Sequence, residues 1–337
     1  MNSKLLNPTV AGALGVSLLI ITAATARAEA EDKITKSFET AAGGQLVVDV
    51  DRGSIEVKTG DAGTVTIEVT RKAGGSKSKA EKTLKDHVVT TQQTGDKVEV
   101  RAKYEGEKLT GWFGGRSPDL QVSFLITIPR KFDVELKTAG GHIKVAELTG
   151  KLKAHSSGGN LTFKQIEGPV SAHTSGGHIN VAGVRGDVDL KTSGGNLTLS
   201  DIEGDVTAST SGGHINADKL SGRIVVKTSG GNIGFAENKG SIEAKTSGGN
   251  VTAELIEQPS SDCLFDTSGG NITIAFAEKV AVDVDASTSG GRVSTDLPVV
   301  SVVQGEQRKN ELKGKINGGG PLVKAHTSGG NVRLAKK

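Results

Sequence analysis

Residues 174–191 read TSGGHINVAGVRGDVDLK, and residues 192–209 read TSGGNLTLSDIEGDVTAS. The two segments have equal length and share the Thr-Ser-Gly-Gly start, a Gly at the thirteenth position and most aliphatic positions. The Gly-Gly pair recurs at this constant interval from Gly140 to Gly248, and later pairs begin at Gly269, Gly290 and Gly329. A fixed 18-residue period is typical of proteins built from stacked repeats.

Aliphatic and polar residues alternate within each repeat, and the alternation changes phase twice. Period two predicts β-strands and a change of phase predicts a corner, so the first copy should hold strands at 142–146 and 150–156. We expect the Gly-Gly bend to need left-handed or ε-like backbone, which glycine alone adopts at low cost. The residue two positions after each pair is aliphatic in all ten copies: Ile143, Leu161, Ile179, Leu197, Ile215, Ile233, Val251, Ile272, Val293 and Val332.

A single repeat has too few aliphatic side chains to be stable alone, so its strands must pair with those of neighbouring repeats. The sequence therefore predicts an all-β solenoid of parallel strands. One turn could be a single 18-residue repeat or a 36-residue pair of repeats, because the residue after the Gly-Gly pair alternates between His and Asn, as in His142 and Asn160. We favour the 18-residue turn, since the longer one would enclose an interior too wide for these small side chains.

Residues 1–28 have the pattern of a secretory signal peptide. Lys4 supplies a positive charge, residues 10–25 form an uncharged apolar run, and Ala26-Arg27-Ala28 places small residues at a cleavage site. An uncleaved anchor is the alternative, but the run is short and rich in Ala and Thr. We predict an exported protein, in the periplasm, at the cell surface or secreted, with no transmembrane segment in the mature chain.

Three regions follow the predicted signal peptide (1–28). Residues 29–137 show irregular strand patterns and one helix-like segment, and we interpret them as irregular rungs or a cap. Residues 138–297 carry the regular repeats. Residues 298–337 contain a charged break in the period and then one more repeat, which we interpret as an insertion with a C-terminal rung or cap.

The charge balance limits the kinds of partner that the protein could bind, and the cysteine count limits how the fold could be stabilised. Loss of Lys4 and Arg27 from 41 basic residues leaves 39 against 38 acidic residues, a net charge near +1. This balance argues against a nucleic-acid partner, which would require a basic surface. Cys263 is the only cysteine, so no disulfide framework is expected, and its place in an inward column predicts a core residue.

Two pairs of residues are candidate sites. His155 and His173 occupy the same outward column in adjacent repeats and are weak candidates for a transition-metal site. The column continues with Lys191, Ser209 and two further Lys, which is not a ligand set, so we interpret it as a solvated polar face. Trp112 and Phe113 stand in a Gly-rich loop and could contact a partner, although covering an open end of the solenoid is the favoured interpretation.

No convergent catalytic set is evident, so we predict no enzyme activity and no cofactor. Asp187 and Asp205 are in one column of adjacent repeats, as paired carboxylates for glycoside cleavage would be. Their column is otherwise mixed, and no aromatic platform for a sugar accompanies them.

The chain resembles the DUF4097 "putative adhesin" family of bacterial exported β-strand repeat proteins. The resemblance runs from about Phe38 to Val332, through Ile126-Thr127-Ile128-Pro129 and the iterated Thr-Ser-Gly-Gly-Asn/His-Ile motif. It implies a right-handed single-stranded parallel β-helix without established enzymatic activity. Fold alone does not settle function.

Three hypotheses follow. The first is a non-catalytic, adhesin-like scaffold that binds an envelope or extracellular protein or glycan. The second is an envelope-stress or signalling accessory module that uses residues 76–118 to touch one protein. The third, which we favour least, is a polysaccharide-active β-helix enzyme.

Overall fold

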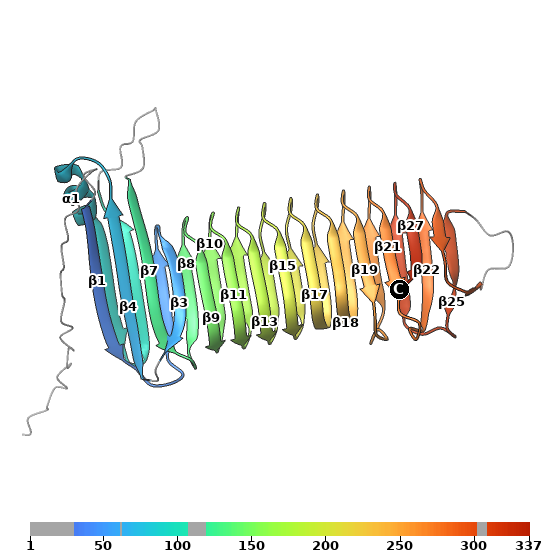
Figure 1. The fold of residues 1–337 in the computed structure, drawn as a ribbon, viewed down its shortest axis with the longest axis horizontal. Coiled ribbons are helices and arrows are strands. Elements are labelled where there is room, and N and C mark those ends of the chain that lie inside the picture. The colour runs from blue at the N-terminus through green and yellow to red at the C-terminus, as the bar shows by residue number, and fades with distance from the viewer. Residues whose placement is uncertain (1–29, 61–62, 107–118, 302–308) are drawn as a thin grey trace, which may run out of the picture.

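The computed structural model describes residues 30–60, 63–106, 119–301 and 309–337. These residues form 27 strands and one helix, and the strands join in one hydrogen-bonded sheet. The strands stack into an elongated body with the helix at one end (Figure 1). The predicted signal peptide, residues 1–28, lies outside the described residues.

The regular part of the stack consists of parallel strands whose partners are one repeat apart in the sequence. Each repeat contributes two strands, such as β9 (Ile143–Thr149) and β10 (Leu152–Ser156). The strand β9 pairs with β11 (Leu161–Glu167), and β10 pairs with β12 (Val170–Thr174). The same register continues through β13 (Ile179–Arg185), β14 (Val188–Lys191), β15 (Leu197–Glu203), β16 (Val206–Ser209), β17 (Ile215–Lys227) and β18 (Ile233–Thr246).

The aliphatic columns fill the interior of the stack. In one repeat, Leu161, Phe163 and Ile166 have no exposed surface, and Val170 is 2% exposed. Because the pairing is in register, each of these side chains packs on its equivalent in the next repeat, which forms one continuous core. Cys263 is buried in the same column as Val323.

The Gly-Gly pairs are required for a reason other than the expected one. Neither Gly158 nor Gly159 has a positive φ, so the expectation of left-handed backbone at this bend is wrong. A Cβ on Gly159 would instead lie 1.8 Å from the carbonyl oxygen of Gly141, the equivalent residue of the preceding repeat. A Cβ on Gly158 would meet nothing within 4 Å. The second Gly therefore permits the close approach of two backbones.

The corner on the opposite side of each repeat does use left-handed backbone. Glu147 and Gln165 have φ of 61° and 55°, and the equivalent residues of the following repeats behave alike. The central Gly at this corner has φ of 150° in Gly150 and 141° in Gly168. A Cβ on Gly168 would also lie 2.4 Å from the oxygen of Gly150, so this Gly column meets two constraints at once.

The N-terminal end does not follow chain order. The strand β2 (Gln45–Val50) lies between β6 (Lys97–Tyr104) and β8 (Asp133–Thr138). Likewise β3 (Ser54–Gly60) lies between β7 (Leu120–Pro129) and β9. The strands β2 and β3 therefore form an inner rung. The chain then forms the end of the stack on one side of this rung, and the regular repeats begin on its other side.

Antiparallel strands and a helix cover this end. The strand β4 (Thr64–Ala73) pairs antiparallel with β7 and with β1 (Ala30–Glu39), and β5 (His87–Thr94) pairs antiparallel with β6. The helix α1 (Lys77–Asp86) packs beside β1, β4 and β5 (Figure 1). Antiparallel end strands interrupt the parallel register, which limits addition of further strands from another molecule.

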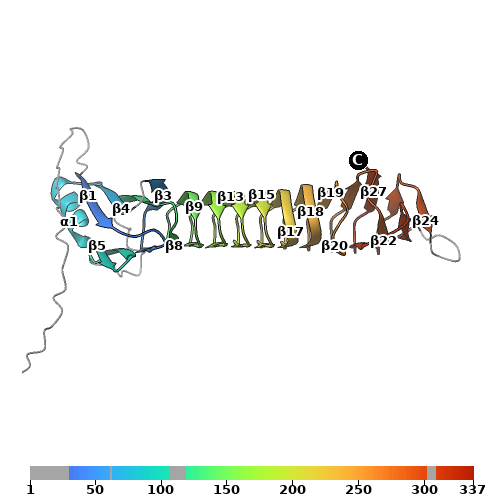
Figure 2. The same cartoon turned by 90° about the horizontal axis from the view of Figure 1, so that it is seen from below.

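The C-terminal end is also out of chain order. The strand β26 (Leu322–Thr327) lies between β20 (Cys263–Thr267) and β22 (Val282–Thr288). Similarly, β27 (Val332–Lys336) lies between β21 (Ile272–Phe276) and β23 (Val293–Thr295). The last repeat in the sequence is thus inserted into the stack, next to β21 and β22 (Figures 1 and 2). The remaining strands are β19 (Val251–Leu255), β24 (Val299–Ser301) and β25 (Glu311–Ile316).

The hairpin at the far end is antiparallel. The strand β25 pairs antiparallel with both β22 and β24. Both ends of the described stack therefore finish in antiparallel strands, while the middle is parallel throughout.

Candidate functional site

A column of buried Thr residues lies beside the Gly-Gly pairs, and their hydroxyls form hydrogen bonds with backbone groups. The hydroxyl of Thr174 donates to the carbonyl of Gly159 (3.0 Å) and accepts the N–H of Gly177 (3.4 Å). Ser156 makes the same two bonds in the preceding repeat. Because each hydroxyl satisfies one group in its own repeat and one in the repeat before, it acts as a clamp between repeats. Equivalent clamps are made by Thr192, Thr210, Thr228, Thr246, Thr267 and Thr327.

The alternating His and Asn residues form a second ladder on the outside of this corner. The N–H of Asn160 donates to Nδ1 of His142 (2.9 Å), and the N–H of His178 donates to Oδ1 of Asn160 (2.9 Å). Asn and His side chains therefore both accept backbone N–H groups at this corner. An accepting Nδ1 requires the neutral tautomer with hydrogen on Nε2.

His155 and His173 lie opposite each other in neighbouring strands, as their shared column predicts. Their rings stack with centroids 5.2 Å apart and planes 12° from parallel. Nitrogen lone pairs lie in the ring planes, so two stacked rings do not direct them at one ion. Across the described ranges, no group of three or more His, Cys, Asp or Glu residues is placed to hold a metal.

These two histidines are instead the middle of a line of basic residues. Lys137 lies opposite His155, and Lys191 lies opposite His173. Burial lowers the pKa of His173, and the neighbouring His155 and Lys191 lower it further because each disfavours another positive charge. We call Lys137, His155, His173 and Lys191 the basic column.

Asp187 and Asp205 occupy adjacent rungs, and both serve the backbone. The N–H of Asp205 donates to Oδ1 of Asp187 (3.0 Å), and the N–H of Arg223 donates to Oδ1 of Asp205 (3.0 Å). Asp133 accepts the N–H of Lys151 (2.8 Å) in the same way. Each carboxylate accepts a backbone N–H at the start of a strand in the next repeat, so these aspartates have a structural role.

A shallow groove of about 470 Å³ lies beside these aspartates. It is open to solvent and lined by residues of four successive repeats, among them Lys151, Lys153, Pro169 and Asp187.

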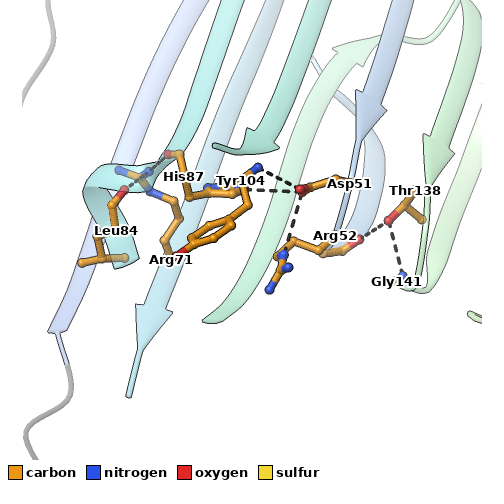
Figure 3. Close-up of polar contacts among 9 residues, drawn as sticks. Asp51, Arg52, Arg71, Leu84, His87, Tyr104, Thr138 and Gly141 are labelled. Carbon is orange, nitrogen blue, oxygen red and sulfur yellow. Dashed lines mark hydrogen bonds and ion pairs between the residues drawn. The ribbon is translucent and has the colours of Figure 1, made fainter. Parts of the chain in front are cut away.

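The described residues also contain a polar cluster at the N-terminal end (Figure 3). His87 is 1% exposed, and its Nε2 lies 3.9 Å from Oδ1 of Asp51. Oδ2 of Asp51 accepts the N–H of Tyr104 (2.8 Å), and the guanidinium of Arg52 lies 5.5 Å from the Tyr104 ring centre. Within the described part of the chain, neither ring nitrogen of His87 has a hydrogen-bond partner.

Arg71 ties this cluster to the surrounding elements. Its guanidinium makes a two-bond contact with Asp32 of β1 (2.8 and 2.5 Å). It also donates to the carbonyls of Leu84 in α1 and His87 in β5 (Figure 3). Burial lowers the pKa of His87, and the charge of Arg71 lowers it further, whereas Asp51 opposes the change. Arg71 and His87 are buried, and the contacts of Arg71 join β1, β4, α1 and β5 at this end of the stack.

Three residues singled out in the sequence, Cys263, Trp112 and Phe113, differ in what the structure describes of them. Cys263 is 2% exposed, and burial raises the pKa of its thiol, so it lacks the thiolate character of a nucleophile. Trp112 and Phe113 fall in residues 107–118, outside the described residues, and their role as a partner contact stays a prediction.

Sequence reasoning missed the roles of the aspartate and histidine ladders. A signal was present, because Asp or Asn at one fixed position before a strand is typical of side chains that accept backbone N–H groups. The stacking of His155 on His173, in contrast, could be predicted from the 18-residue alignment alone.

The geometry defines an all-β stacked-repeat protein with polar ladders at its corners and a parallel, in-register core. The chain belongs to the Toastrack DUF4097 family, whose model matches residues 44–335. The resemblance seen in the repeat motif is therefore confirmed. Among the described residues, no helix has the length and apolar character needed to span a membrane.

Several solved structures are similar to the chain. A "putative adhesin" from Parabacteroides distasonis shares 13% identity, with 90% of this chain and 97% of that chain covered and a TM-score of 0.46. A "putative adhesin" from Bacteroides fragilis shares 12% identity, with 90% and 97% covered and a TM-score of 0.30. A "putative lipid binding protein" from Parabacteroides distasonis shares 11% identity, with 90% and 96% covered and a TM-score of 0.30. No curated protein matches the chain.

Proposed function

We propose that this protein is a non-catalytic, adhesin-like scaffold that is exported and binds an envelope or extracellular partner through its long repetitive faces. The observation that carries the proposal is the in-register stacking of outward side chains over successive repeats. Such a surface presents polar and charged side chains in lines, at a spacing of about 4.8 Å between successive repeats. It suits an extended partner that makes many similar contacts, each of them weak.

The chemistry-bearing residues support a binding role over catalysis. The Thr hydroxyls, the corner His and Asn side chains and the aspartates each bond to the backbone of a neighbouring repeat. Groups used in this way stabilise the stack and are not free to act on a substrate. The stack itself then provides a rigid, extended surface.

The architecture that we propose for this scaffold is a right-handed single-stranded β-helix in which each turn is one repeat. The register supports this turn length, since each strand of the regular part pairs with the equivalent strands of the repeats before and after it. The handedness follows the preference of parallel crossover connections.

The proposal can be tested in the cells that make the protein. A tagged full-length chain is crosslinked in place, the cells are fractionated, and captured molecules are identified by mass spectrometry and sugar analysis. We expect the protein in the envelope or the medium, crosslinked to a component of that compartment. A protein confined to the cytoplasm, or one that captures nothing, would contradict the proposal.

A further inference from the structure

The two long corners of the stack differ in charge. We call the corner that carries the Gly-Gly pairs the Gly-Gly edge. Its segments contain five Lys, five His and no Asp or Glu. The corner on the other side, in six segments of seven residues starting at 147, 165, 183, 201, 219 and 237, contains nine Asp and Glu against six Lys and Arg. The segments of the Gly-Gly edge are 137–144, 155–162, 173–180, 191–198, 209–216, 227–234 and 245–252.

The basic column contains the lysines of this edge that have no ion-pair partner among the described residues, since Lys144, Lys227 and Lys245 are paired. Its four residues occupy consecutive rungs, so at a strand spacing of about 4.8 Å they span about 14 Å along the stack. Lys137 and Lys191, which flank the two stacked histidines, are exposed and have no ion-pair partner among the described residues. Other lysines of the edge are paired, as Lys227 and Lys245 are with Glu243 (3.6 and 2.9 Å).

Two acidic residues share this face with the column, and one of them, Asp189, favours the protonated form of His173. Glu135 and Asp189 each stand two residues before a lysine of the column, and Glu135 lies opposite Lys153 of the next strand. The two ammonium groups of Lys137 and Lys191, on either side of the stacked histidines, create a local positive potential on a protein of nearly zero net charge.

Hydrogen-bond donors continue the surface around the corner. The Ser residues that precede each Gly-Gly pair, such as Ser157, Ser175 and Ser193, are exposed. Asn160 and Asn196 use Oδ1 to accept a backbone N–H, which leaves their amide hydrogens for a ligand or solvent. The edge therefore combines cations with donors at a regular spacing.

We propose that the Gly-Gly edge binds a linear acidic glycan, with its carboxylate or sulfate groups along the basic column and its hydroxyls on the Ser and Asn side chains. The inference rests on the proposed function and names the ligand class for it. A polymer that repeats its own charge can engage several rungs at once, which multiplies weak contacts.

Two other polyanions fit less well. A membrane surface would call for exposed apolar side chains, but the large exposed hydrophobics among the described residues are Val88 and Val300, both away from this edge. Single-stranded nucleic acid would call for Phe, Tyr or Trp platforms for its bases, and the seven segments contain none.

The test measures binding of the mature protein to immobilised polygalacturonate and dextran sulfate, with neutral dextran as the reference. We expect binding to at least one acidic polymer, little to dextran, and weakening as salt is raised. The double variant Lys137→Gln/Lys191→Gln should weaken binding about tenfold. The matched control Lys219→Gln/Lys239→Gln removes the same charge from the opposite corner and should bind like the wild type.

Each outcome bears on the proposal. Equal losses in the two double variants would show attraction by net charge alone and would overturn the site. Failure to bind either acidic polymer, while crosslinking in cells still captures an envelope component, would overturn the glycan inference and leave the scaffold function standing. Tighter binding to anionic vesicles or DNA than to the glycans would assign the edge to another partner. Thermal unfolding of both variants establishes that they are folded.

Discussion

A Cβ atom placed on Gly159 would lie 1.8 Å from the carbonyl oxygen of Gly141, one repeat earlier. The same close approach recurs in later repeats. A Cβ on Gly177 would lie 2.0 Å from the carbonyl oxygen of Gly159, and one on Gly195 would lie 1.9 Å from that of Gly177. The second Gly of each pair therefore sets how closely successive repeats stack at this corner.

The two glycines of one pair should respond differently to substitution. Gly159→Ala forces a methyl group against the backbone of the preceding repeat and should destabilise the protein by about 1 to 3 kcal/mol or more. Gly158→Ala adds a methyl group in open space and should change stability by less than about 0.5 kcal/mol. Urea unfolding followed by circular dichroism measures both, and similar losses would contradict the stacking argument.

The buried hydroxyl of Thr192 should matter more than its methyl group. Its Oγ1 donates to the carbonyl of Gly177 (2.9 Å) and accepts the N–H of Gly195 (3.3 Å). Thr192→Val keeps the shape and leaves both groups without this partner, so we expect a loss of about 1 to 3 kcal/mol. Thr192→Ser keeps the hydroxyl, as Ser156 does in an earlier repeat, and should cost about 0.8 kcal/mol. A valine variant as stable as the serine variant would refute the clamp.

Asp205 should act as a hydrogen-bond acceptor for the chain rather than as an acid. Asp205→Asn retains an oxygen that can accept the N–H of Arg223, so stability should stay close to that of the wild type. Asp205→Ala removes the acceptor and should cost about 0.5 to 1.5 kcal/mol. Thermal unfolding of the two variants decides the matter, and equal effects of Asn and Ala would show that the ladder contributes nothing.

The buried His87 should make the protein less stable in mild acid. The unfolded chain takes up a proton at His87 near pH 6.5, but the folded protein resists it because burial and Arg71 lower the pKa of this group. Stability should therefore be unaffected well above pH 7 and fall as the pH drops below about 6.5, by up to about 1.4 kcal/mol per pH unit.

The variant His87→Gln isolates this effect. Its unfolding free energy should fall less than that of the wild type between pH 7.5 and pH 5.5, whatever its absolute stability. Urea unfolding at a series of pH values compares the two slopes. Parallel curves would mean that His87 is protonated equally well in the folded and unfolded chains.

Much of the regular part could be predicted from residue columns. Inward positions such as Ile143 and Leu161, the corner Gly150 and the stacking of His155 on His173 all follow from an 18-residue alignment, because in-register pairing turns sequence period into spatial contact. The reason for the Gly-Gly pair could not be predicted in this way. It depends on the distance between backbones in different repeats, which no single repeat contains.

Part of the candidate site could be predicted and part could not. The line of Lys137, His155, His173 and Lys191 is visible in the sequence once the period is known. Which lysines are paired depends on side chains from other rungs, as when Glu243 reaches both Lys227 and Lys245. The residues around His87 are Asp51, which follows β2, Arg71 of β4 and Tyr104 of β6, so no local pattern reveals them.

The sequence by itself determined the repeat, its inward and outward columns and the family, because a two-residue alternation and an 18-residue period are local properties of the chain. Only the tertiary structure decided the order of the rungs at the two ends. There β2 lies between β6 and β8, and β26 lies between β20 and β22. Similar strands can pair in more than one order, and the order is selected by how the antiparallel ends close over the core, which depends on contacts between distant parts of the chain.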